Sequence, residues 1–269
     1  NISAAIHAPT SGKVVKISEE ILPHPSGLPD FCITIEPDFK DTWVEKKPIS
    51  WKTLDRNKLI EAISQSGIVG LGGAVFPTHM KLKINQSQLI NTLVINAAEC
   101  EPFITCDDML MRERADEIIQ GSLIAQTILG AKECVVGIEN NKTEAYEALK
   151  KAAQKTSIEI KVVPTLYPSG DAKRLIYLLM GIEVPKEKRS VDLGIQVFNV
   201  ATVAAIYRYL EFGEPSISRI VTITGAVKVP QNYEALFGTP LSELIIAAGG
   251  SPNKTKKFIM GGPMMGFDL

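Results

Sequence analysis

The feature that most constrains the fold is a regular alternation of strand-like and helix-like segments between residues 55 and 214. Short apolar runs predict buried strands at 92–96, 134–138 and 158–163. Capping residues, apolar spacing and helix-stopping glycines predict helices at 55–66, 118–129, 171–180 and 199–210. A further helix is predicted from a capping box at Asn141–Glu144 to about residue 154. This rhythm implies an α/β fold with a mostly parallel central sheet covered by helices.

The two flanking segments have a different character. Residues 1–48 are rich in proline and glycine, with β-prone runs at 13–17 and 31–36, which predicts a small all-β module. Beyond residue 215 an alternating strand at 219–224, a short helix at 240–248 and a strand at 257–260 predict a compact α+β unit. We therefore expect three domains, over residues 1–48, 49–214 and 215–269.

Composition excludes several classes of protein. The chain is 45% hydrophobic and 22% charged, as in soluble globular proteins, and a net charge of −1 gives no electrostatic case for nucleic acid or an anionic membrane surface. No apolar run approaches the roughly 20 residues that span a bilayer. Four cysteines without Cys-x-x-Cys or Cys/His spacing argue against a metal site and favour a reducing compartment. The first residue is not Met and the last residues end abruptly, so we expect a piece of a longer protein.

The run Gly70–Lys81 carries the first candidate chemistry. Three glycines in four residues let backbone approach a ligand and present N–H groups to a phosphate. Phe76 could stack on a flat ring, and Lys81 could balance negative charge. The run matches neither a Rossmann fingerprint nor a P-loop, and the alternative interpretation is a glycine-rich turn.

Polar residues also follow the predicted strands, where ligand crevices of open α/β sheets lie. Asn96, Glu99 and Glu101 follow the strand at 92–96 and could bind a ring edge and sugar hydroxyls, or could form a solvated turn. The segment 167–171 and Asn199 each precede a predicted helix, where capping is the alternative role.

These motifs resemble two related families. Gly70–Lys81 resembles the flavin loop of the NADH-binding flavoprotein subunit of respiratory complex I. Residues 96–107 (Asn-Ala-Ala-Glu-Cys-Glu-Pro-Phe-Ile-Thr-Cys-Asp) are similar to the Glu-Cys-Glu-Pro motif of the RnfC family, a component of the Rnf electron-transport complex. Tyr167–Gly170 and Asn199–Thr202 fit two further motifs, and the resemblance covers essentially all 269 residues.

The resemblance implies a more specific fold. Residues 7–14 and 23–27 are similar to that family's barrel-sandwich module, and residues 219–265 to a soluble-ligand-binding β-grasp (SLBB) unit. The central domain is then Rossmann-like, with helices on both faces of the sheet.

The resemblance also implies a function. The chain would exchange hydride between NAD(H) and FMN, and FMN would pass electrons to four-iron clusters that lie outside this chain. Glu101, beside the nicotinamide, and Lys81, against the flavin, would serve the reaction. The cofactor-binding residues would be Gly70, Gly72, Gly73, Phe76, Lys81, Asn96, Glu99, Glu101, Tyr167, Gly170, Asn199 and Thr202.

Partners and location follow from the same resemblance. We expect other Rnf-type membrane subunits as partners, peripheral attachment at the cytoplasmic face of a bacterial membrane, and no membrane span in the chain itself. Leu71, Ala98 and Ala172 depart from the complex I pattern and weaken its polar contacts to both ligands. Alternatives are a cobalamin reductase, a cluster-free subunit of sodium-pumping NADH:quinone reductase, and a docking scaffold with a degenerate nucleotide site.

Overall fold

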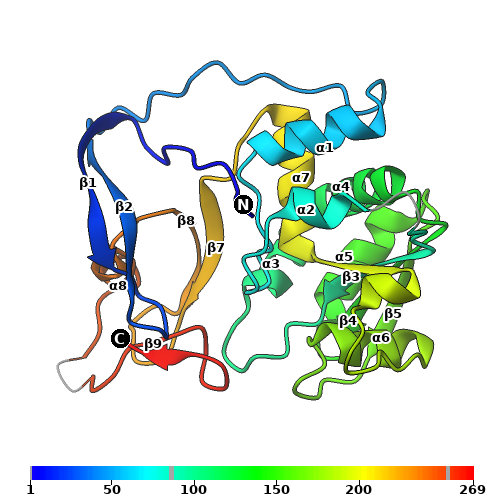
Figure 1. The fold of residues 1–269 in the computed structure, drawn as a ribbon. Coiled ribbons are helices and arrows are strands. Elements are labelled where there is room, and N and C mark those ends of the chain that lie inside the picture. The colour runs from blue at the N-terminus through cyan, green and yellow to red at the C-terminus, as the bar shows by residue number, and fades with distance from the viewer. Residues whose placement is uncertain (1, 85–87, 253–254) are drawn as a thin grey trace. The chain divides into compact units, whose positions relative to one another are not determined.

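The fold is described from a computed structural model, over residues 2–84, 88–252 and 255–269. Contacts divide the chain into two compact units, one of residues 1–7 and 47–216 and the other of residues 8–46 and 217–269. Figure 1 shows the elements of both units.

A four-stranded parallel sheet forms the centre of the first unit, in the order β5-β4-β3-β6. Its strands are β3 (Thr92–Ala97), β4 (Glu133–Glu139), β5 (Glu159–Val163) and β6 (Ile195–Asn199). The helices are α1 (Arg56–Gln65), α2 (Thr78–Leu82), α3 (Cys106–Glu113), α4 (Ala115–Leu129), α5 (Thr143–Ala153), α6 (Ala172–Met180) and α7 (Val200–Phe212), with a 3-10 turn at Ser190–Leu193. The parallel α/β architecture predicted from the alternating pattern is confirmed.

Helices cover both faces of this sheet (Figure 1). On one face Val94 and Val197 pack with Leu175 and Ile176 of α6. The alternate residues of β3 point to the other face, where α4, α5 and α7 lie. Strand β3 is buried on both faces, which explains its continuous apolar sequence.

Local signals set most helix ends where the sequence predicts them. Asp171 caps α6 by accepting the Arg174 N–H at 3.0 Å, and Gly181 ends that helix in the left-handed conformation at φ 69°. The predicted capping box at Asn141–Glu144 is wrong. Helix α5 begins after Lys142, which makes no side-chain cap hydrogen bond, although the helix itself is present.

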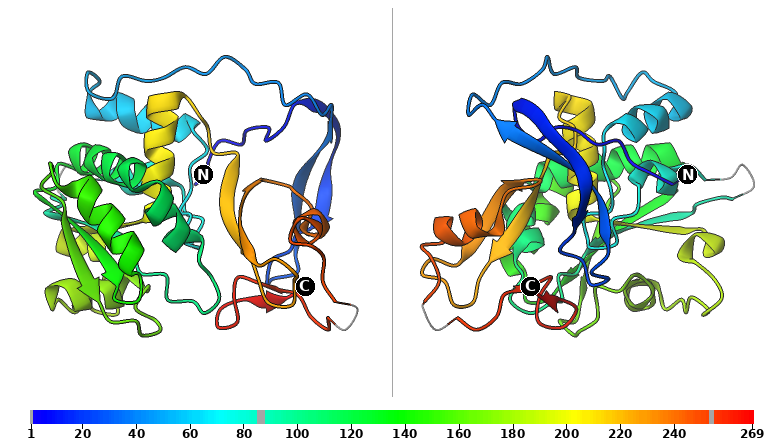
Figure 2. Two further views of the ribbon diagram at one scale, coloured as in Figure 1. Left: turned by 180° about the vertical axis from the view of Figure 1, so that it is seen from behind. Right: turned by 60° about the vertical axis from the view of Figure 1, so that its left-hand side comes forward.

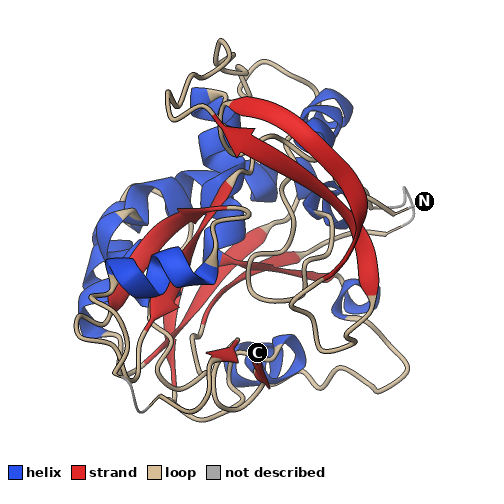
Figure 3. Cartoon of the chain, turned by 90° about the vertical axis from the view of Figure 1, so that its left-hand side faces the viewer, coloured by secondary structure: helices blue, strands red, loops and turns tan. Residues whose placement is uncertain are grey.

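Two longer antiparallel ribbons, one helix and a short strand pair make up the described part of the second unit. Strands β1 (Gly12–Ile21) and β2 (Pro29–Pro37) form the long curved ribbon of Figure 3. Strands β7 (Ser218–Ile223) and β8 (Gln231–Leu236) form the other, followed by α8 (Leu241–Ala247), in gold to orange in Figure 2. The short pair β9 (Ile259–Met260) and β10 (Phe267–Asp268) completes the unit, so the strand predicted over 257–260 covers only its last two residues.

Helices α4 and α7 cross at Gly121, and a substitution there tests how closely the two helices pack. A Cβ atom at Gly121 would lie 1.9 Å from the Val203 carbonyl oxygen, so the two backbones meet with no space for a side chain. We expect Gly121→Ala to lower the free energy of unfolding by about 3 kcal/mol, because backbone cannot move aside as a side chain can.

Denaturant unfolding followed by circular dichroism measures that change. Thr127→Ala, on the exposed face of the same helix, is the matched control and should stay within about 0.5 kcal/mol of the wild type. Equal stability of the Gly121→Ala variant and the wild type would contradict the close helix crossing.

Candidate functional site at the carboxyl edge of the sheet

The sheet has a switch point between β3 and β6, where the order in which the chain adds strands changes direction. The chain runs from β3 to β4 to β5 in one direction, then returns to the opposite side of β3 to form β6. The last residues of the β3–β6 pairing, Asn96 and Asn199, are direct partners in the parallel register. Ligands of open α/β sheets bind at such a switch point, at the carboxyl ends of the strands.

The glycine run forms a closed loop. A β-bridge joins Val69 to Pro77, and the Gly70 N–H donates to the Phe76 carbonyl at 2.9 Å. The Val75 N–H donates back to the Gly70 carbonyl at 3.1 Å, so the loop closes on itself. The chain segment between these bonds is largely exposed to solvent.

The exposed part of this loop offers free hydrogen-bond donors. The backbone N–H groups of Gly72, Gly73 and Ala74 have no acceptor within the described part of the chain. Gly73 has φ 106°, a conformation that L side chains rarely adopt, which explains a glycine there. Three consecutive donors at a switch point are suited to an anion.

Helix α7 holds this loop beside the end of β6. The Leu71 N–H donates to Thr202 Oγ1 at 3.0 Å. A Cβ atom at Gly72 would lie 3.0 Å from the Cβ of Asn199, so a larger residue would displace one of the two. The structure thus brings the predicted residues Gly72, Asn199 and Thr202 together.

The two paired asparagines hold neighbouring loops in place. Asn199 caps α7 by accepting the Ala201 N–H at 2.9 Å, and its amide nitrogen donates to Asp107 at 2.6 Å. Asn96 accepts the Ala98 N–H at 3.1 Å and donates to the Gly170 carbonyl at 2.8 Å. Both ends of each amide are therefore bonded within the protein.

Glu99 is buried and caps helix α3. Its carboxylate accepts the N–H groups of Asp107 at 2.7 Å and Asp108 at 3.1 Å. Lys142 lies 3.4 Å from the second oxygen, and the two side chains are only 4% and 9% exposed. Asp107 and Lys142 were not predicted for the site. Lys142 lies between β4 and α5, and no local sequence signal connects it with a glutamate 43 residues earlier.

The ligand atoms of Glu99, Cys106 and Asp107 lie within 4.8 Å of one another, a spacing that a metal ion could use. Their hydrogen bonds account for this spacing. Cys106 Sγ donates to Glu99 at 3.3 Å, and the same carboxylate accepts the N–H groups of α3. The cluster is a helix cap.

Lys81 lies against the free edge of β6. Its ammonium donates to the Val197 carbonyl and lies 4.5 Å from the centre of the Phe198 ring. The Lys81 carbonyl also accepts from the Gln196 side chain at 2.7 Å. Burial lowers the pKa of Lys81 to about 8. In this position Lys81 covers an unpaired strand edge with polar contacts.

The loop after β5 packs on the loop after β3. A Cβ atom at Gly170 would lie 2.6 Å from the Ala98 carbonyl oxygen, and the Gly170 N–H donates to Cys100 Sγ at 3.2 Å. Tyr167 lies nearby, where burial and then the Glu101 carboxylate raise the pKa of its phenol. The Glu101 carboxylate therefore lies close enough to Tyr167 to act on its phenol.

Two further predicted residues, Gly70 and Phe76, belong to the glycine loop itself. Phe76 is 40% exposed, a large accessible ring beside the loop, and a Cβ atom at Gly70 would meet only ordinary contacts of 3.7 Å or more. Gly70 therefore has no packing requirement for glycine within the described structure.

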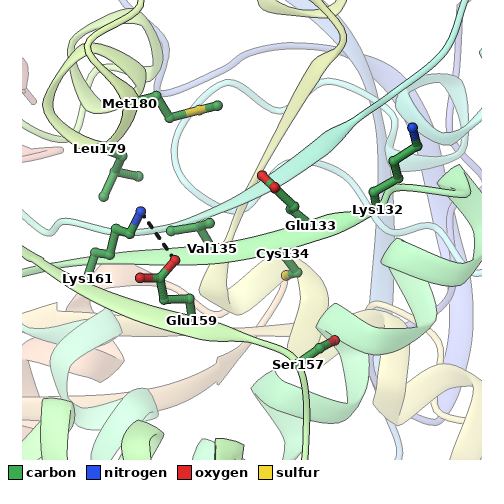
Figure 4. Close-up of a pocket in the computed structure, with 9 residues that line it drawn as sticks. All are labelled: Lys132, Glu133, Cys134, Val135, Ser157, Glu159, Lys161, Leu179 and Met180. Atoms are coloured by element: carbon green, nitrogen blue, oxygen red, sulfur yellow. Dashed lines mark ion pairs between the residues drawn. The ribbon is translucent and has the colours of Figure 1, made fainter.

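A separate hollow of about 490 Å³ lies at the opposite edge of the sheet (Figure 4). Its lining residues come from the amino ends of β4 and β5 and the end of α6, and Lys161 pairs with Glu159 there at 3.2 Å. Because ligands of such sheets bind at the carboxyl ends, this hollow is the weaker candidate.

Family models match three parts of the chain. Residues 63–208 match the Nuo51 FMN-binding domain, residues 1–40 the RnfC barrel sandwich hybrid domain, and residues 220–268 the SLBB domain. The C subunit of the ion-translocating oxidoreductase complex of Erwinia tasmaniensis is 48% identical over 98% of this chain. The chain belongs to the RnfC family. The same-named protein of Haemophilus influenzae is also 48% identical over 98% of the chain.

The match covers only part of those RnfC proteins. The chain spans 33% of the Erwinia protein and 32% of the Haemophilus protein, about a third of each. The fold of this RnfC chain also matches a chain of the NAD+-reducing [NiFe]-hydrogenase in the H2-reduced state, with a TM-score of 0.64 at 23% identity, over 77% of this chain and 41% of that one. None of the helices in the described part of the chain combines the length and the apolar sequence that a membrane span needs.

The buried ion pair behind the site yields a stability prediction. Replacing Lys142 by Met leaves the Glu99 carboxylate buried without its cation, and we expect a loss of roughly 3–5 kcal/mol in the free energy of unfolding. The double variant Lys142→Met/Glu99→Gln removes the uncompensated charge and should recover part of that loss. Denaturant unfolding of both variants measures the effect, and a loss below about 1 kcal/mol for Lys142→Met alone would contradict burial of the pair.

Lys81 yields a prediction about pH. Its pKa is about 8 in the folded protein and 10.5 ordinarily, so between these values the unfolded chain binds more protons. The free energy of unfolding should therefore rise with pH across this window because of Lys81. Lys81→Met should remove this rise. Denaturant unfolding at a series of pH values from about 8 to 10.5 measures the slope of the free energy of unfolding against pH. The same slope in the wild type and in Lys81→Met would show that Lys81 is not desolvated.

Proposed function

We propose that this chain forms the FMN- and NAD(H)-binding part of an ion-translocating oxidoreductase and exchanges hydride between the two cofactors. The observation that carries the proposal is the exposed Gly72–Ala74 segment, whose three N–H groups lack acceptors among the described residues and lie at the switch point between β3 and β6. A phosphate group there would be held by backbone, as the match to an FMN-binding domain leads us to expect.

The residues present fit an FMN phosphate and a ribityl chain. A side chain at Gly72 would crowd Asn199, and Gly73 has φ 106°, a backbone conformation that L side chains rarely adopt. Gly70 would continue this cradle. When bound, FMN supplies a ring that accepts a hydride from nicotinamide and passes electrons singly to iron–sulfur centres.

The predicted residues would serve the ligands in two ways. One group holds the surrounding loops together and would place the ligands chiefly by fixing those loops. Its members are Asn96, Glu99, Asn199, Thr202 and Gly170. Phe76 would stack on a ring of the dinucleotide, and Glu101 with Tyr167 would line the nicotinamide side.

Lys81 would act through charge. Its ammonium lies at the outer edge of β6, at the Val197 carbonyl, and from there it would stabilise negative charge that develops on a reduced ring at the switch point. Its lowered pKa of about 8 leaves it mostly protonated at neutral pH.

The rest of the electron path would lie outside this chain. We propose four-iron clusters in the remainder of the polypeptide, other subunits of a membrane complex as partners, and a peripheral position on the cytoplasmic face. The relatives are subunits of an ion-translocating oxidoreductase complex, which supports membrane partners.

Flavin retention by the full-length protein, in its complex and with its clusters, tests the proposal. We expect FMN absorbance to co-elute with the wild type and to bleach when NADH is added without oxygen. Gly72→Val should abolish retention, because its side chain would displace Asn199 and fill the cradle.

Gly130→Ala is the matched control, since it strains a glycine at φ 66° that ends α4 and has no neighbour within 4 Å of the added carbon. It should retain flavin despite a modest loss of stability. Absence of flavin from the wild-type complex would support the docking-scaffold alternative and overturn the proposal; retention by a folded Gly72→Val variant would show that the cradle lies elsewhere.

A further inference from the structure

A buried carboxyl group without a hydrogen bond lies beside the proposed site. Glu139 is the last residue of β4 and is 1% exposed. Neither of its carboxyl oxygens has a hydrogen-bond partner within the described residues. Strand β4 pairs with β3 up to Ala97 and Ile138, so Glu139 lies at the same carboxyl edge as Asn96.

The groups that face Glu139 come from two loops. Glu99 and Cys100 follow β3, and Lys142 precedes α5. From β5, the register partner of Glu139 is the uncharged Val163. Among the described residues, the neighbourhood of Glu139 therefore contains one further carboxyl group and one ammonium group.

The ammonium is already paired with the other carboxylate. Lys142 lies 3.4 Å from Glu99, which also accepts two N–H groups of α3. Ionised Glu99 is thus stabilised by a cation, by two N–H groups and by the Cys106 thiol, whereas ionised Glu139 would be a buried charge with no hydrogen bond from the described residues. Burial therefore raises the pKa of Glu139; Lys142 opposes this rise, and Glu99 adds to it.

We propose that Glu139 is the proton-holding residue of this site: a carboxylic acid that stays neutral to a higher pH than an ordinary glutamate, and that releases or regains one proton as the charge at the carboxyl edge changes. Release breaks the carboxyl O–H bond and sends the proton to solvent, with no electron transferred. The arrival of an anionic group at the edge, such as a flavin phosphate, should tighten proton binding by repulsion of the carboxylate. This coupling rests on the proposed function, whereas the neutral state of Glu139 does not.

Carbon-13 NMR of glutamate side chains tests the protonation directly. The full-length protein labelled at glutamate Cδ is titrated with acid and base, and Glu139→Gln identifies the resonance by its loss. We expect this resonance to titrate at a higher pH than glutamate in the unfolded chain. The matched control is Glu147→Gln, which changes an exposed glutamate of helix α5 and should leave the Glu139 resonance in place. Titration at the ordinary position would overturn the proposal.

Stability against pH gives an independent measurement. Above the ordinary glutamate pKa of about 4.3 the unfolded chain has lost a proton that folded Glu139 still holds, so the free energy of unfolding falls as pH rises toward the raised value. Glu139→Gln should flatten this fall, and Glu147→Gln should not. A rise through the same window attributable to Glu139 would show that the folded protein favours the ionised form.

The same titration with FMN tests the coupling. We expect added FMN, with binding verified by co-elution, to move the Glu139 midpoint to higher pH. Bound FMN with an unmoved midpoint would overturn the coupling while the proposed function stands. Failure of FMN to bind would instead overturn the proposed function, and the titration without FMN would still decide the state of Glu139.

Discussion

The pairing of β3 with both β4 and β6 is the constraint on which the site depends. Parallel pairing brings the carboxyl ends of three strands to one edge, and the return of the chain across β3 opens that edge between Asn96 and Asn199. The contact from Leu71 to Thr202 then holds the glycine loop at this opening. A buried β3, apolar on both faces, keeps this arrangement in place.

Around this opening, polar side chains hold neighbouring loops together, and backbone N–H groups are available to bind a ligand. Asn96 joins β3 to the loop after β5, and Asn199 joins β6 to α3 through Asp107. Glu99 completes this frame by capping α3. In the proposed site, recognition of the ligand would then depend on the shape and N–H groups of the loop at 70–76. The departures from the complex I pattern at Leu71, Ala98 and Ala172 would be less damaging for that reason.

Much of the fold follows from local sequence signals. Asp171 and Asn199 cap their helices through bonds to residues two or three positions away, and Gly181 ends its helix by its own backbone conformation. The wrong capping box at Asn141 shows the limit of such signals. Lys142 is the last residue before the helix, and its side chain forms a buried ion pair instead of a cap. The polar frame of the site could be predicted only in part, because its bonds cross long distances in the sequence. Lys81 reaches a carbonyl 116 residues away, and Asn199 bonds to Asp107 across 92 residues. The sequence pattern identified the segments that meet, and tertiary pairing decided which atoms bond.

Amide chemical-shift mapping with FMN tests most directly whether the ligand lies at the switch point. In a titration of the nitrogen-15-labelled protein with FMN, we expect the largest shifts at the amides of Gly72, Gly73 and Ala74, with smaller shifts at the ends of β3 and β6. Shifts that instead concentrate on the hollow at the opposite edge, around Lys132–Val135 and Ser157–Lys161, would contradict the account.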